Sequence, residues 1–127
     1  MRICIDLDGV VCRLKRPGED TAYADLEPMP GSVEKLRALR AAGHTVILQT
    51  ARHMKTCDGN VGKVLARQGA ALFAWLARHE IEFDEIHFGK PYADVYIDDN
   101  GFRFTSWEAI SGDGANLPVS REKGGGA

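Results

Sequence analysis

The stretch RICIDLDGVVC (residues 2–12) decides the fold, because it places a short apolar run directly beside two carboxylates. The run over residues 3–7 is typical of a buried strand, and the Asp-Gly pair that follows it indicates a loop. A buried strand disfavours acidic side chains, so Asp6 and Asp8 at its end call for an explanation. Gly9 makes a tight turn inexpensive at that point. The stretch therefore predicts a core strand whose carboxyl end presents two acids.

Strand and helix signals alternate along the rest of the chain. Apolar spacing predicts a helix over residues 32–43 and a second helix after residue 62, ending near residue 79. Further strands are predicted over residues 44–48, 85–88 and 93–97, and a last strand or short helix within 102–110. This order predicts an α/β, Rossmann-like fold with a mainly parallel sheet flanked by helices. Residues 1–110 form one predicted domain, and residues 111–127 a flexible C-terminal tail.

Composition excludes several classes of partner. The 127 residues suit one domain, and a net charge of −2 gives no basic field for nucleic acid. No apolar run is long enough to span a bilayer, so no membrane partner is expected. The three cysteines have no CxxC spacing, which indicates reduced thiols in a cytoplasmic protein.

Polar residues follow the predicted strands at the edge where ligands bind in open parallel sheets. Three or four carboxylates at one point repel each other unless a cation lies among them, and oxygen ligands of this kind suit Mg²⁺. A lysine and a threonine hydroxyl beside them make an anion site, for which a phosphoryl group is the natural ligand. The residues concerned are Asp6, Asp8, Thr50, Arg52, Lys90, Asp98 and Asp99.

The chemistry of these residues suggests a covalent mechanism. A carboxylate can attack phosphorus and form an aspartyl-phosphate. An acid two residues further on can protonate the leaving oxygen and then activate water. On this hypothesis Asp6 is the nucleophile and Asp8 the acid and base.

Four short motifs, DLDGV (6–10), Thr50, GKP (89–91) and YIDD (96–99), resemble in order the motifs of the haloacid dehalogenase-like (HAD) phosphohydrolases. The resemblance covers about residues 1–110 and implies the same roles for Asp6 and Asp8. It further implies that Thr50, Ala51 and Lys90 hold the phosphoryl oxygens. Mg²⁺ would be bound by Asp6, Asp98 and the Asp8 carbonyl, with Asp99 as a further ligand or a neighbour of the ligands.

A longer pattern, from TAR (50–52) to YIDD, is similar to a subgroup of capsular or polysaccharide biosynthesis phosphatases. It implies a small phosphorylated metabolite, such as a sugar phosphate, as the substrate. The intervals between the motifs are too short for a cap domain. The site of a capless member is covered by its own loops, by a neighbouring subunit or not at all, and the sequence leaves a homo-oligomer open.

Alternatives remain open at this stage. The same chemistry serves a phosphomutase, and a receiver-like or non-catalytic phosphate-binding domain shares some of these residue types. Asp6 and Asp8 alone also suit a simple turn, and Thr50 a plain strand residue. Arg52, His53 and Asn60 are candidate substrate-binding residues, although each suits a surface loop equally well. Specificity is expected to lie in the loops 13–29 and 53–62.

Overall fold

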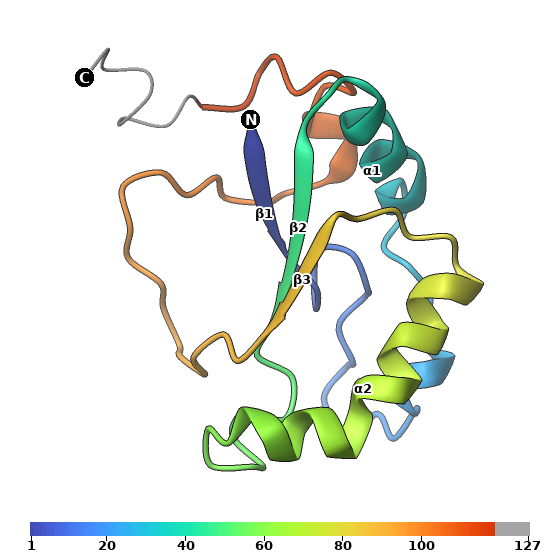
Figure 1. The fold of residues 1–127 in the computed structure, drawn as a ribbon, viewed down its shortest axis with the longest axis vertical. Coiled ribbons are helices and arrows are strands. Elements are labelled where there is room, and N and C mark those ends of the chain that lie inside the picture. The colour runs from blue at the N-terminus through green and yellow to red at the C-terminus, as the bar shows by residue number, and fades with distance from the viewer. Residues whose placement is uncertain (119–127) are drawn as a thin grey trace.

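The computed structural model describes residues 1–118 and shows a three-stranded parallel sheet with two helices (Figure 1). The strands are β1 (Arg2–Asp6), β2 (Thr45–Thr50) and β3 (Glu85–Phe88), in the order β1-β2-β3. The helices are α1 (Ser32–Ala41) and α2 (Val61–Arg78). The predicted small α/β architecture with a helix-flanked parallel sheet is thereby confirmed.

Alternation along the strands gives the sheet one buried and one more open face. Cys4 pairs in register with Ile47, which pairs with Glu85. Ile5 and Leu48 belong to the core, whereas Cys4 is exposed. Because successive side chains point to opposite faces, Asp6 leaves β1 on the side opposite Ile5. The strand thus buries its apolar residues and directs its terminal acid away from the core.

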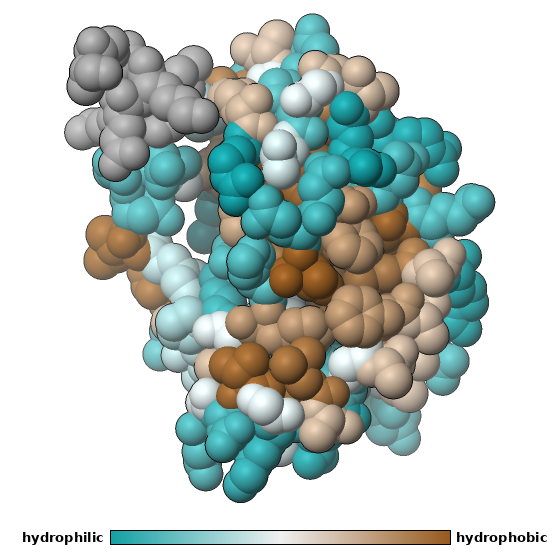
Figure 2. All heavy atoms as spheres, in the orientation of Figure 1, coloured by the Kyte–Doolittle hydropathy of each residue, from teal (hydrophilic) through white to brown (hydrophobic). Residues whose placement is uncertain are grey.

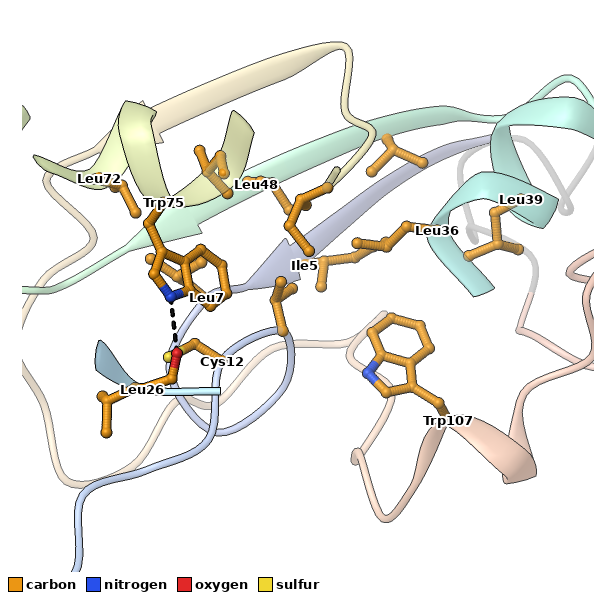
Figure 3. Packing of buried hydrophobic residues seen from close by; sticks show 14 of the residues in the cluster. Ile5, Leu7, Cys12, Leu26, Leu36, Leu39, Leu48, Leu72, Trp75 and Trp107 are labelled. Carbon is orange, nitrogen blue, oxygen red and sulfur yellow. Dashed lines mark hydrogen bonds between the residues drawn. The ribbon is translucent and has the colours of Figure 1, made fainter. Parts of the chain in front are cut away.

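The core lies between the sheet and the helices (Figure 3). The α2 residues Leu72 and Trp75 pack in the same cluster as Leu36 of α1. The indole N–H of Trp75 donates a hydrogen bond of 2.9 Å to the carbonyl oxygen of Leu26, so the buried ring leaves no polar atom without a partner. This contact also fixes the long loop 13–31 against α2.

The short 3₁₀ helix η2 (Trp107–Ala109) supports the first loop from the other end of the chain. Trp107 is buried, and its indole N–H donates to the carbonyl oxygen of Val10 at 2.6 Å.

Of the predicted tail, residues 111–118 are described, and Leu117 packs against the core. His44 Nε2 lies 2.7 Å from the carbonyl oxygen of Asp113. The remainder of the predicted tail, 119–127, lies outside the described residues.

The predicted strand over residues 93–97 does not form, and this prediction was wrong. Val95 is 71% exposed and Ile97 95% exposed, in a loop that runs from β3 past β1 on the side away from the helices (Figure 1). The physical reason is chain length: only residues 89–92 separate β3 from this segment. A parallel strand needs a crossover of about a dozen residues to return to the start of the sheet.

The surface in Figure 2 mixes polar side chains with an apolar area in its middle and lower part. Leu65 and Phe73 of α2 are among the exposed large apolar residues, and the Phe73 ring lies edge-on to Phe88 at 6.0 Å. Within residues 1–118, no helix has the length and apolar character needed to cross a membrane.

Candidate active site

Asp6 and Lys90 meet at the carboxyl end of the sheet. Asp6 is the last residue of β1, and Lys90 follows β3 after a single glycine. Lys90 Nζ lies 3.5 Å from Asp6 Oδ2, and the Leu7 amide donates to Asp6 Oδ1 at 3.1 Å. The Asp6 side chain is 36% exposed and that of Lys90 15%. A reachable carboxylate therefore faces a mostly buried cation.

The environment of Asp6 favours its protonated form. Burial raises the pKa of the Asp6 carboxyl, the Lys90 charge opposes this, and the Asp8 charge adds to it. A carboxylate that is incompletely solvated is a better nucleophile than one in bulk water, provided that a nearby cation keeps it ionised. Lys90 is placed to do so.

Asp6 and Lys90 line a cleft of about 520 Å³ between the free edge of β1 and the loop after β3. Asp98 lines the same cleft, although it belongs to the exposed loop and not to a strand end as predicted. Its Oδ1 accepts a hydrogen bond from the Asn100 amide at 3.2 Å. Gln49, the residue paired with Asp6 in β2, also lines the cleft, as do Arg2 and Asn100, whereas most of the other lining residues are apolar. The structure thus brings three predicted site residues to one cleft.

Asp8 takes a different partner, the guanidinium of Arg52. Arg52 Nη2 lies 2.6 Å from Asp8 Oδ1, and Nε lies 3.1 Å from Oδ2, a two-pronged ion pair. The Arg52 side chain is only 3% exposed, and its guanidinium carbon lies 4.0 Å from the centre of the Tyr23 ring. Gly9, with a φ of 87°, follows Asp8 and allows the chain to turn sharply there. Asp8 is consequently fixed by charge and by packing.

Thr50 connects the two acidic halves of the site. Its carbonyl oxygen accepts from the amides of Gly89 and Lys90 at 3.2 and 3.1 Å. Its hydroxyl accepts from the Arg52 amide at 3.0 Å, and the residue is 1% exposed. The hydroxyl expected to bind phosphate therefore lies buried and holds the backbone that carries Arg52.

The remaining predicted residues lie at the margins. Ala51 is half-buried, and its carbonyl oxygen accepts from the Met54 amide. Asn60 caps α2, accepting from the Lys63 amide at 3.0 Å, and this explains its place in the sequence without a substrate. Asp99 is exposed in the loop after β3. His53 lies edge-on to Tyr23, with 5.6 Å between ring centres.

The donor chemistry suits Mg²⁺. Asp6 and Asp98 offer carboxylate oxygens to one cleft, and burial together with the Asp8 charge leaves Asp6 in need of positive charge. Within residues 1–118, no three histidine, cysteine or acidic side chains form a metal-binding group. Mg²⁺ needs no such group, because it commonly binds through one or two carboxylates and completes its shell with water and substrate phosphate. The residues present therefore fit this ion.

Comparison with solved structures places the chain beside a protein from Vibrio cholerae, a structural target whose crystal structure carries no stated activity. The two share 33% sequence identity, and the match covers 81% of this chain and 84% of the other, with a TM-score of 0.71. The two proteins belong to one family. No family model matches the chain, and no curated protein does so. The fold of the Vibrio cholerae relative thus agrees with the one described here, and its name assigns no chemistry.

Sequence reasoning missed two residues near Arg52, the partner of Asp8. Tyr23 and Lys15 come from the loop 13–29, which carries no recognisable motif, yet Lys15 Nζ lies 4.0 Å from the centre of the Tyr23 ring. Tyr23 begins the one-turn 3₁₀ helix η1 (Tyr23–Asp25), which is too short for a periodic pattern to mark it. The only available signal was the expectation that this loop contributes to specificity.

Proposed function

We propose that the protein is a Mg²⁺-dependent phosphomonoesterase of the HAD type. The observation that carries this proposal is the pair of Asp6 and Lys90, 3.5 Å apart at the carboxyl end of a parallel sheet and opening into a cleft. A nucleophile and a cation in this arrangement suit attack on a phosphoryl group, whose transfer depends on charge neutralisation and positioning. The four motifs that resemble HAD phosphohydrolases support the same reading.

The reaction has two steps. In the first, Asp6 Oδ2 forms a bond to phosphorus as the ester bond breaks, and the leaving oxygen takes a proton from Asp8. In the second, Asp8 takes a proton from water, whose oxygen attacks phosphorus and releases Asp6 and inorganic phosphate. Lys90 offsets the negative charge of the phosphoryl oxygens throughout. Asp8 enters the first step protonated and turned from Arg52 towards the leaving group. Once it has given up this proton, the Asp8 carboxylate, the form that the second step needs, pairs with Arg52.

Asp6, Asp98 and the Asp8 carbonyl would hold Mg²⁺, as the resemblance implies. When bound, the ion supplies positive charge against the phosphoryl oxygens. The cleft admits a small phosphorylated metabolite such as a sugar phosphate, whose phosphoryl group would bind among Asp6, Lys90 and Asp98, while most other lining residues are apolar.

The test is release of inorganic phosphate from p-nitrophenyl phosphate with MgCl₂. Asp6→Asn removes the nucleophile and keeps its shape, so turnover should fall by about 1,000-fold or more. Asp84→Asn, at an exposed aspartate away from the cleft, is the matched control and should keep wild-type turnover. Circular dichroism verifies that both variants fold.

Three outcomes overturn the proposal. Absence of phosphate release with Mg²⁺ present removes phosphatase activity, and unchanged turnover in Asp6→Asn removes the nucleophile. Phosphorus NMR that shows a sugar phosphate isomerised without free phosphate would assign a phosphomutase instead.

A further inference from the structure

Tyr23 lies at the centre of a cluster of basic side chains next to Asp8. Lys15 Nζ and the Arg52 guanidinium carbon each lie 4.0 Å from its ring centre, and the His53 ring lies edge-on to it. Tyr23, Lys15 and His53 are half-buried, so they remain reachable from solvent. The three come from the two loops that flank the proposed catalytic residues.

The basic side chains of this cluster outnumber the acidic ones. Arg52 is paired with Asp8, but among residues 1–118 no acidic side chain lies within 4.0 Å of Lys15 Nζ. Arg37 and Arg40, by contrast, have such partners in Glu82 and Asp84. A lysine stacked on a ring beside a second cation, with no carboxylate of its own, retains a charge that an anionic ligand can satisfy.

Two further observations concern His53, one of charge and one of backbone geometry. Burial lowers the pKa of its imidazole, and the charges of Arg67, Arg52 and Lys15 add to this effect, opposed only by Asp8. Its backbone has a φ of 62°, a left-handed conformation that a residue with a side chain rarely adopts. Strain of this kind persists where the surroundings fix a side chain, and it is frequent at ligand-binding positions.

We infer that Lys15, His53 and Tyr23 form a subsite for a second anionic group of the substrate, a carboxylate or a second phosphate. This inference rests on the proposed phosphatase function. Asp8 connects the subsite to the nucleophile, because its carboxylate contacts Arg52 and it stands two residues after Asp6. The phosphoryl group lies at Asp6 and Lys90, and the other end of the substrate extends past Asp8 to Tyr23. The subsite thus selects phosphate esters that carry an additional negative charge.

Two substrates of matched size test the inference. 3-Phosphoglycerate and glycerol 3-phosphate differ only in a carboxylate that replaces a hydroxymethyl group. The wild-type protein should show about 10- to 100-fold higher kcat/KM for 3-phosphoglycerate, mostly through a lower KM. Lys15→Met should remove this preference and Lys15→Arg should retain it, whereas Lys63→Met, at an exposed lysine on α2, should leave it unchanged. Fructose 1,6-bisphosphate against fructose 6-phosphate distinguishes a second phosphate from a carboxylate.

Calorimetric titration of Asp6→Asn with 3-phosphoglycerate and glycerol 3-phosphate gives a readout independent of turnover. Tighter binding of 3-phosphoglycerate, lost in Asp6→Asn/Lys15→Met, is the expected result. Turnover of both esters with equal kcat/KM and equal affinities overturns the subsite and leaves the phosphatase proposal standing. Absence of turnover with every ester overturns the phosphatase proposal, and equal affinities then reject the subsite as well.

Discussion

Asp6 and Asp8 stand two residues apart, and each is paired with a cation, yet their surroundings differ. Asp6 meets one cationic nitrogen, Lys90 Nζ at 3.5 Å, and opens into a cleft. Asp8 is bound by two nitrogens of Arg52, whose guanidinium is stacked on Tyr23. A loose pair leaves a carboxylate free to react, whereas a two-pronged buried pair fixes its position.

One turn thus carries two carboxylates with different surroundings: Asp6 is open to the cleft, and Asp8 is held in place by Arg52. The Asp6 half uses a lysine, a compact charge on a flexible stem. The Asp8 half uses an arginine, whose planar fork matches a carboxylate and stacks on a ring. Thr50 connects both halves, through its carbonyl on one side and its hydroxyl on the other.

The largest effect is expected on the Asp6 side. On the proposed function, Lys90→Met removes the charge that offsets the phosphoryl oxygens, and kcat should fall by about 100- to 1,000-fold. Stability should change little, because the partner Asp6 is partly solvated. Steady-state kinetics and urea unfolding measure the two quantities. A Lys90→Met protein with wild-type kcat would separate Lys90 from the chemistry.

On the Asp8 side, stability should respond more strongly. Arg52→Met leaves Asp8 without its partner in a half-buried place and should lower the free energy of unfolding by about 1–3 kcal/mol. Adding Asp8→Asn to Arg52→Met should recover part of that loss, because the uncompensated charge is gone. Urea unfolding of the two single variants and the double variant forms the cycle. Strict additivity of the two losses would show that the pair is not coupled.

Gly89 precedes Lys90 and donates its amide hydrogen to the carbonyl oxygen of Thr50. A substitution there tests the backbone that connects the Asp6 half of the site to the Asp8 half. Gly89 has a φ of 97°, and a β-carbon there would lie 2.8 Å from Val61 Cγ2. Gly43 has a φ of 94° with nothing within 4 Å, so Gly43→Ala is a control for backbone strain alone. Gly89→Ala should therefore cost about 1 kcal/mol more than Gly43→Ala in thermal or urea unfolding. Val61→Ala in the Gly89→Ala background should remove this difference, and a persistent difference would contradict the contact.

The smallest effect is expected at an exposed acid outside the site. The Val46 amide, 2.8 Å from Asp84 Oδ2, and then Arg40 lower the pKa of the Asp84 carboxyl. A lowered pKa stabilises the folded state above the ordinary pKa of aspartate, and this stabilisation is lost as the pH falls through the folded value. Asp84→Asn should therefore be less stable than wild type at pH 7, with a smaller difference at pH 3. Urea midpoints at the two pH values measure it, and an equal difference at both would exclude this linkage.

The regular elements were accessible from the sequence because their patterns agree with their surroundings. The alternation over residues 3–7 and the periodicity of α2 both correspond to buried faces. The pattern over residues 93–97 has the same alternation without a partner strand, and the four residues after β3 leave no crossover to reach one. The number of residues between two elements thus indicates whether a segment can reach a partner strand, whereas its residue types alone do not.

The candidate site was accessible only in part, for a related reason. Strand order brings Asp6 and Lys90 to one edge, since Asp6 ends β1, Lys90 closely follows β3, and both strands pair in parallel with β2. The pairing of Asp8 with Arg52 and the stacking on Tyr23 depend on how two irregular loops pack. No local pattern encodes such packing, because it is set by the shape of the finished core.

The hydrogen bond from Trp107 to the carbonyl oxygen of Val10 joins residues 97 positions apart. During synthesis, the loop that carries Asp8 leaves the ribosome long before the tryptophan that supports it. The turn between β1 and the first loop therefore gains this support only after almost the whole described chain has emerged. Contacts of such long range are slow to form, so the order of synthesis makes maturation of the site a late event in folding.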